Sequence, residues 1–133
     1  MDSGNIFKVW GERRRILLTD KTEIDYLKLK INTFCSRHSH YKKINLFYVL
    51  KGKVKIESEF GKIILKKGQA FEIKPPLKHR FVAITNAEMI EIAYVEEGKI
   101  DPNDIDREKQ GGRIMYGQEL TEDELRKKGW LEL

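Results

Sequence analysis

The three histidines of the chain are the residues whose type and spacing most clearly suggest chemistry. His38 and His40 are two residues apart, and His79 follows the Pro75-Pro76 turn. Side chains two positions apart on an extended strand point to the same side, so His38 and His40 present a pair of imidazoles. A returning strand that carries His79 would add a third nitrogen at the same point. Three imidazoles that meet in this way predict a site for a divalent metal ion.

Short strands are the elements that the sequence predicts around these histidines. The expected strands span residues 24–34, 45–50, 54–57, 62–65, 71–73, 80–85 and 89–95. The first alternates between apolar and polar residues but loses phase at Tyr26-Leu27, which indicates a bulge. The second is apolar throughout, typical of a strand that is covered on both faces. Strands of this length, about ten residues apart, predict an all-β antiparallel barrel or sandwich.

The last third of the chain has the signals of helices. Asp101-Pro102 combines a capping side chain with proline at the first helical position. Thr121 and Glu124 form a capping box, and Gly129 would end the helix that they open. We therefore expect two short C-terminal helices that pack on the barrel or on a partner chain. A second copy would cover the apolar tip at Trp130-Leu131, which predicts a homodimer.

Composition narrows the class of protein. The chain has 133 residues, of which 40% are hydrophobic and 35% are charged, typical of a globular protein. Its 26 basic and 21 acidic residues leave a formal charge of +5. The lysines are scattered and only Arg13-Arg14-Arg15 form a cluster, which argues against nucleic-acid binding. Cys35 is the only cysteine, so an internal disulfide is excluded and a reducing compartment is expected.

Sequence signals for membranes and export are absent as well. The apolar run of residues 46–50 is far shorter than the ~20 residues of a membrane span. Met1 to Gly4 lack the basic start of a signal peptide. We therefore expect a cytoplasmic protein that binds neither membranes nor nucleic acid. We expect one domain over residues 1–133, with a core at about residues 9–113 and a C-terminal helical extension over residues 114–133.

Two motifs make the chain resemble the cupin superfamily. The first joins His38-Ser39-His40 to a ligand position at Asn45 and ends at Gly52, and the second passes through Pro75-Pro76 to His79. All three histidines fall on metal-ligand positions of that family. The resemblance implies a double-stranded β-helix, the jelly-roll barrel of cupins, that holds a divalent metal ion. Zinc, manganese, nickel and iron are the candidate metals.

A narrower resemblance lies outside these motifs. Val9-Trp10-Gly11, His79-Arg80, Ile90-Glu91-Ile92 and Gly112-Arg113 are similar to segments of the cupin domains of bacterial mannose-6-phosphate isomerases and mannose-1-phosphate guanylyltransferases. This resemblance implies a metal-dependent enzyme of carbohydrate metabolism that interconverts mannose 6-phosphate and fructose 6-phosphate. The candidates for binding the substrate, a phosphorylated sugar, are Arg37, Arg80, Arg107 and Arg113. Arg80 and Arg113 are favoured because they match the family pattern.

The pocket lining and the catalytic base are less defined by the sequence. We expect Phe47 and Tyr94 to line the pocket, although core packing explains such aromatic residues as well. An isomerase also needs a base that moves a proton between neighbouring carbons. Glu72 and Glu91 lie within expected strands, but alternation allows both to face solvent. The identity of the catalytic residue therefore stays open.

Asn45 departs from the cupin pattern, because it stands where a glutamate ligand is expected. An amide oxygen can bind a divalent ion, but it is neutral and a weaker donor than a carboxylate. The site would then hold metal with Asn45 or water, hold it weakly, or hold none. Three functions stay open: a sugar-phosphate isomerase, a three-histidine metal-dependent dioxygenase, and a non-catalytic module that binds a sugar or sugar nucleotide.

Overall fold

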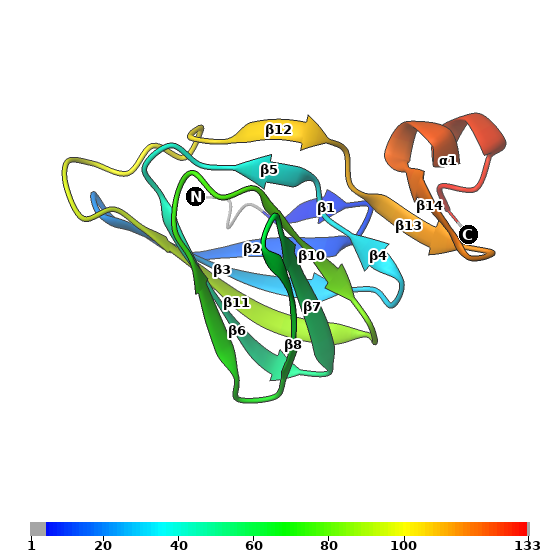
Figure 1. Ribbon diagram of the computed structural model, residues 1–133, viewed down its shortest axis with the longest axis horizontal. Coiled ribbons are helices and arrows are strands. Elements are labelled where there is room, and N and C mark those ends of the chain that lie inside the picture. Colours follow the sequence, from blue (N-terminus) through cyan, green and yellow to red (C-terminus); the bar gives the residue numbers. More distant parts are fainter. Residues whose placement is uncertain (1–4, 133) are drawn as a thin grey trace.

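Two antiparallel β-sheets curve around a common core (Figure 1). The computed structural model describes residues 5–132, so Met1 to Gly4, on which the expectation about export signals rests, lie outside the described residues. The first sheet contains, in spatial order, β1 (Ile6–Lys8), β2 (Gly11–Leu18), β3 (Thr22–Leu29), β11 (Ala87–Tyr94), β6 (Ile44–Lys51) and β9 (Ala70–Ile73).

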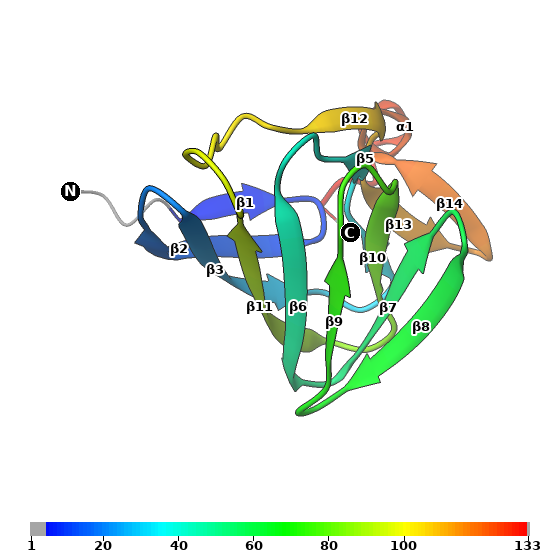
Figure 2. The same cartoon turned by 60° about the vertical axis from the view of Figure 1, so that its left-hand side comes forward.

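The second sheet closes the barrel from the other side (Figure 2). Its main path is β12 (Asp106–Lys109), β5 (Arg37–Ser39), β10 (His79–Ala83), β4 (Thr33–Phe34), β13 (Gly112–Met115) and β14 (Gln118–Thr121). Beside this path, β7 (Lys53–Ser58) pairs with both β10 and β8 (Gly61–Lys66). This arrangement confirms the all-β jelly-roll barrel that the strand pattern and the motifs predicted.

The inward face of the first sheet is polar at one end and apolar at the other. On β3 the buried positions alternate without a break, and they are Glu23, Asp25, Leu27 and Leu29. The register of β3 against β11 is regular over its whole length, so the bulge predicted at Tyr26-Leu27 is absent. The apparent loss of phase arises because the same inward face lines first a polar cavity and then the apolar core.

The apolar core fills the end of the barrel interior that lies away from the polar cavity. The side chains of Phe47, Val49, Val54, Ile56 and Met89 are at most 1% exposed. Burial of each such side chain contributes about 1.5–3 kcal/mol to stability relative to exposure. Aromatic packing continues to the barrel wall, where the rings of Trp10 and Phe81 meet edge to face with centroids 5.2 Å apart.

Gly52 ends the first motif for a steric reason. It forms the turn between β6 and β7 with φ of 80°, a conformation that side chains rarely adopt. A Cβ atom at this position would also lie 2.4 Å from the carbonyl oxygen of Asn86. The turn therefore requires glycine, and it takes the chain from β6 in the first sheet to β7 in the second.

The C-terminal third contains one helix rather than two. The helix predicted at Asp101-Pro102 is wrong, because this segment forms turns and then β12, which pairs with β5. Residues 114–121 belong to the β13–β14 hairpin, so the extension is helical only from residue 122. The expected capping box of Thr121 and Glu124 is confirmed at the start of α1 (Glu122–Lys128), which ends at Gly129. Within residues 5–132 no helix is long and apolar enough to cross a membrane.

Candidate metal centre

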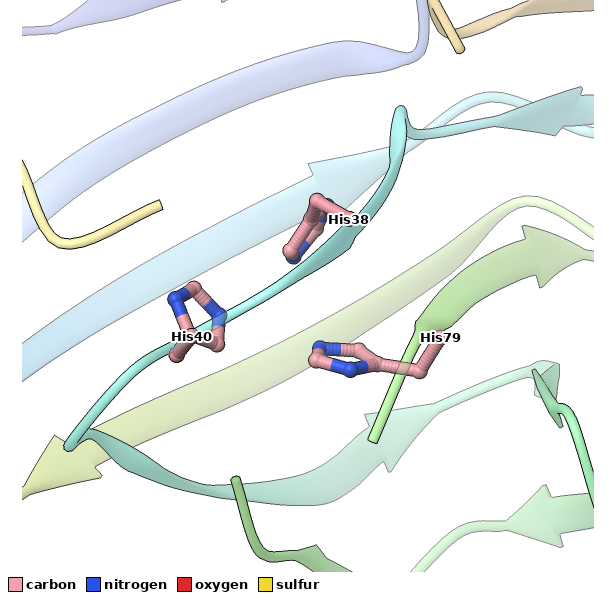
Figure 3. Close-up of side chains that lie close together, drawn as sticks. All are labelled: His38, His40 and His79. Atoms are coloured by element: carbon pink, nitrogen blue, oxygen red, sulfur yellow. The ribbon is translucent and has the colours of Figure 1, made fainter. Parts of the chain in front are cut away.

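β5 and β10 bring the three histidines together (Figure 3). His38 on β5 pairs in register with His79 at the start of β10, and His40 directly follows β5. The ring centroid of His38 lies 5.0 Å from that of His40 and 4.6 Å from that of His79. One nitrogen of each ring lies within 4.8 Å of the corresponding atoms of the other two. All three side chains are buried, so the predicted triad exists.

A backbone carbonyl fixes the orientation and the protonation of each ring. Nδ1 donates a hydrogen bond to the carbonyl oxygen of Ser36 in His38 (2.7 Å), of Asp104 in His40 (2.7 Å) and of Leu77 in His79 (2.9 Å). Because a carbonyl only accepts, each neutral ring carries its proton on Nδ1 and a lone pair on Nε2. Metal-binding histidines are held in this way in most known sites.

The three rings are also held in the neutral form that binds metals. Burial lowers the pKa of His38 to about 3, and the neighbouring rings of His79 and His40 add to this effect. Burial likewise lowers the pKa of His79 to about 4, and it lowers the pKa of His40 below its ordinary value. No proton therefore has to leave Nε2 at neutral pH before a metal ion binds.

Asn45 lies beside the triad and links it to a carboxylate. Its side chain is 1% exposed, and its Nδ2 donates hydrogen bonds to Nε2 of His40 and to Oε2 of Glu91, each over 3.1 Å. Two buried atoms have no hydrogen-bond partner among the residues that the structure describes: Oδ1 of Asn45 and Nε2 of His79. Unpaired polar atoms are costly in a protein interior, so these two atoms indicate a missing partner.

The donor set fits a divalent transition metal. Three neutral imidazoles and an unpaired amide oxygen are ligands that such ions accept, and two of the candidate donor atoms lack any other partner among the described residues. The residues that would hold the ion are His38, His40 and His79, with Asn45 as a neutral fourth ligand. Metal binding itself stays a prediction.

A cavity of about 460 Å³ opens next to the triad and is lined by His38, His40 and Asn45 on one side. Its wall also carries nine charged side chains, which are Lys8, Arg13, Arg15, Glu23, Asp25, Lys43, Glu91, Arg107 and Glu122. A volume of this size is ordinary for a small-molecule site, but so many charges are not. The cavity is therefore suited to a small polar molecule.

Comparison with known families decides which family the chain represents. Residues 26–93, about half of the chain, match the cupin domain. The chain belongs to the cupin family. No curated protein sequence matches this cupin. The match supports the broad resemblance seen in the two motifs, whereas the narrower one to mannose-6-phosphate isomerase stays a prediction.

Solved structures share the fold of this cupin at low sequence identity. KdgF from Halomonas sp. is 22% identical with a TM-score of 0.60, and the match covers 65% of this chain and 79% of that one. Ectoine synthase from P. lautus is 18% identical with a TM-score of 0.61, over 80% and 81% of the two chains. Oxalate decarboxylase from Bacillus subtilis is 19% identical with a TM-score of 0.68 over 80% of this cupin, which spans 30% of that chain.

Glu91 is the carboxylate that the sequence left undecided. It lies on the inward face of β11, directly opposite Asp25 on β3 and Phe47 on β6. Burial raises its pKa to about 7, and the negative charge of Asp25 adds to the shift. Within residues 5–132 the structure shows no ion pair for Glu91. Its carboxylate is therefore free to exchange a proton with a molecule in the cavity.

Two other acidic residues of the cavity wall, Glu23 and Asp25, are held by cations. Glu23 accepts hydrogen bonds from Arg15 (2.9 Å) and from Lys43 (3.2 Å). Asp25 accepts one from Nε of Arg15 over 2.6 Å. These pairs neutralise Glu23 and Asp25, whereas Glu91 has no ion pair among the described residues.

The arginines favoured by the sequence lie away from the cavity. Arg80 is on the face of β10 opposite His79, where it donates to Glu57 (2.7 Å) and Glu119 (2.7 Å). Arg113 donates to the carbonyl oxygens of Trp130 and Leu131 and so fixes the C-terminal segment. Neither residue lines the cavity beside the triad.

The two aromatic candidates differ in their positions. Phe47 is 1% exposed and lies under the triad, with its ring centroid 6.1 Å from that of His79. Tyr94 is on the outer face of β11, and its hydroxyl donates to Glu72 over 2.7 Å. Phe47 thus supports the histidines from the core, whereas Tyr94 does not line the cavity.

Sequence reasoning missed the polar half of the barrel interior. Glu23 and Asp25 are in phase with the buried Leu27 and Leu29, and this phase was visible in the sequence. Apolar residues on the outer face, such as Ile24 and Ile90, made the opposite face look like the core. The two-residue alternation along these strands is compatible with Glu23, Asp25 and Glu91 on the inward face. It predicts this placement only for a barrel whose interior is partly polar.

Proposed function

We propose that this cupin is a metal-dependent enzyme that transfers a proton on a small polar substrate, and that its reaction is the aldose–ketose isomerisation of a sugar phosphate. The observation that carries the proposal is the position of Glu91, which lines one cavity with His38 and His40 and is joined to His40 through Asn45. Isomerisation needs a Lewis acid and a base at one substrate. The histidines would hold the first, and Glu91 is the second.

The residues divide the chemistry between them. A divalent ion on His38, His40 and His79 would supply a Lewis acid that polarises a substrate oxygen. Glu91 takes a proton from the carbon beside the substrate carbonyl and returns it to the carbonyl carbon, while the hydroxyl proton passes to the former carbonyl oxygen. The carboxylate thus ends in its starting state. Its pKa of about 7 suits both directions of this transfer near neutral pH. Asn45 positions Glu91 by donating to Oε2.

The similar structures support a small-molecule substrate. Two of them are named as oxalate decarboxylase and ectoine synthase, which are enzymes of small molecules. The charged wall of the cavity supports a polar substrate over an apolar one. The mannose-6-phosphate isomerase resemblance of the sequence selects sugar phosphates within this class.

Metal content and a Glu91→Gln variant together test the proposal. Elemental analysis is expected to find about one divalent ion per chain, and the His38→Ala/His40→Ala variant is expected to lose it. Glu91→Gln keeps the hydrogen bond partner of Asn45 but cannot take a proton, so it should retain metal while the isomerisation of mannose 6-phosphate slows by about 10²–10⁴-fold. Coupled detection of fructose 6-phosphate measures the rate.

Glu88→Gln is the matched control, because Glu88 is on the same strand but accepts a hydrogen bond from Tyr26 on the outer face. This variant should keep both metal and rate. A Glu91→Gln variant with the wild-type rate would reject Glu91 as the base. Iron as the bound metal, with oxygen consumption in place of isomerisation, would favour the three-histidine dioxygenase.

A metal-free binding module is the second candidate, and one contact favours it. Nδ2 of Asn45 donates to Nε2 of His40, which occupies a lone pair that a metal ion would need. Protein that stays metal-free in excess divalent ions would support this function. The histidines and Asn45 would then bind sugars or sugar nucleotides directly, and a thermal shift with these compounds would detect it.

A further inference from the structure

We propose that Lys8, Arg13 and Arg107 form an anion subsite at the mouth of the cavity, and that this subsite binds the phosphate group of the substrate. The proposal deepens the proposed function and rests on it, since it takes this cavity as the substrate site. It also assigns phosphate recognition to residues other than Arg80 and Arg113, whose side chains are engaged elsewhere.

The strands place the three cations around one opening. All three residues line the cavity that His38 and Glu91 also line. Arg107 on β12 lies directly opposite His38 on β5 in an antiparallel pair, and opposed residues of such a pair point to the same face. Arg13 on β2 lies opposite the buried Leu27 on β3, which puts Arg13 on the inward face as well. Lys8 ends the neighbouring strand β1.

These cations differ from the other basic residues of the cavity in having no counter-ion. Arg15 and Lys43 are held in ion pairs with Glu23 and Asp25. In the part of the chain that the structure describes, Lys8, Arg13 and Arg107 have neither an ion pair nor a side-chain hydrogen bond. Their donors are therefore available to a ligand.

The three positive charges act on one another. Burial lowers the pKa of Lys8, and the charges of Arg13 and then Arg107 lower it further, while Glu122 opposes them with a smaller effect. The same two arginines line one cavity with Glu91 and His38, where the proposed reaction takes place. A bound anion would relieve this repulsion.

A phosphate monoester matches this subsite better than a carboxylate. At pH 7 the monoester carries about −1.5 to −2 charges and three acceptor oxygens, against a single charge for a carboxylate. Two guanidinium groups and an ammonium group can donate to all three oxygens at once. The subsite would hold the phosphate at the mouth and direct the sugar carbons toward Glu91 and the triad.

Calorimetric titration of the full-length protein with inorganic phosphate and with acetate tests the subsite. Phosphate is expected to bind at least tenfold more tightly than acetate at equal pH and ionic strength, and the affinity should fall as sodium chloride is added. Arg13→Gln and Arg107→Gln should each weaken phosphate binding about tenfold or more. Arg14→Gln is the matched control, because Arg14 is on the same strand, faces outward and pairs with Glu12. This variant should bind phosphate as the wild type does.

Two results would overturn the subsite: acetate binding as tight as phosphate binding, or phosphate binding that is unchanged in both Arg13→Gln and Arg107→Gln. Melting curves of the variants verify that each is folded, and Arg13→Lys should restore part of the affinity because it restores the charge. Failure of the proposed function gives a different pattern. Phosphate would then bind through Arg13 and Arg107, but no sugar phosphate would be isomerised and Glu91→Gln would change nothing.

Discussion

Asn45 and Glu91 together explain how a cupin barrel tolerates a neutral residue at a carboxylate position. Asn45 on β6 pairs with Ala93, and Glu91 lies two residues away on the same face of β11. A glutamate side chain in place of Asn45 would put two carboxylates side by side, and their repulsion would oppose ionisation of both. The amide instead donates to Glu91 and keeps it in place. The neutral ligand position and the carboxylate in the cavity are thus parts of one arrangement.

Asn45→Glu is the residue-scale prediction that follows. The variant should melt at a lower temperature without added metal, because the introduced carboxylate and that of Glu91 repel each other. It should gain more in melting temperature than the wild type when zinc or manganese is added, because a carboxylate is the stronger ligand and binding to the folded state stabilises it. Scanning calorimetry with and without metal measures both effects.

The double variant Asn45→Glu/Glu91→Gln supplies the control for this prediction. Removing the second carboxylate should restore the melting temperature of the metal-free protein. A metal-induced shift in Asn45→Glu no larger than that of the wild type would contradict the placement of residue 45 as a ligand.

At the scale of elements, the segment between β11 and β12 holds the second histidine of the first motif. The carboxylate of Asp104 accepts hydrogen bonds from the backbone N–H groups of Tyr41 (2.7 Å), Lys42 (2.8 Å) and Lys43 (3.1 Å). Partial burial raises the pKa of Asp104, but these hydrogen bonds outweigh it and keep the pKa below its ordinary value. The carbonyl oxygen of the same residue orients His40. Asp104 therefore fixes both the turn at residues 41–43 and the orientation of the His40 ring.

Asp104→Ala should loosen this turn. We expect a loss of about 2 kcal/mol in the free energy of unfolding, because charge-assisted hydrogen bonds are lost from a partly exposed site. Metal affinity should fall about tenfold as His40 becomes less ordered. Urea unfolding and metal titration measure the two effects.

Asp101→Ala is the control, since Asp101 is exposed in the same segment and caps only the backbone of Asn103. It should leave metal affinity unchanged. Equal losses of metal affinity in both variants would show that general loosening of the loop, and not the contacts of Asp104, is responsible.

The same segment shows the limit of local sequence signals. Asp101-Pro102 has the chemistry of a helix start, yet no helix forms there, because Asp104 and β12 bind to the turn after His40 and to β5. Contacts with residues about sixty positions away in the sequence outweigh the local preference. At Thr121 and Glu124 no such partner competes, and the capping box forms as its spacing predicts.

At the scale of the whole molecule, the predicted homodimer needs a surface, and the structure offers a different one from the C-terminal tip. Trp130 packs against Tyr116 with ring centroids 5.8 Å apart and contacts Lys128, so its own chain partly covers it. On β1 and β2, in contrast, the exposed apolar side chains are Ile6, Phe7, Ile16, Leu17 and Leu18. Strand β1 is also the end of its sheet, with one edge available for a second copy.

Light scattering after gel filtration tests the homodimer. We expect a mass of about twice 15.7 kDa, and the variant Ile16→Lys/Leu18→Lys should shift it toward a single chain. Ile63→Lys/Ile64→Lys on the exposed edge strand β8 is the control and should leave the mass unchanged. A wild-type mass of 15.7 kDa at micromolar concentration would contradict the prediction.

The sequence by itself determined the barrel and the three histidines. Strand periodicity is a local property, and the two-residue spacing of His38 and His40 on an extended segment directs both side chains to one side. The approach of His79 was predicted from the resemblance to the second cupin motif, and the pairing of β10 with β5 brings it about. Tertiary structure alone decided the rest of the site. Whether Glu91, Arg13 and Arg107 face the cavity or solvent depends on which face of each strand meets the opposite sheet. The ordinary rule that the apolar face of a strand points inward does not hold at the polar end of this barrel. Arg80 and Arg113 were expected at the substrate site but lie outside the cavity. Arg80 is held there by Glu119, and Arg113 by the carbonyl oxygen of Trp130.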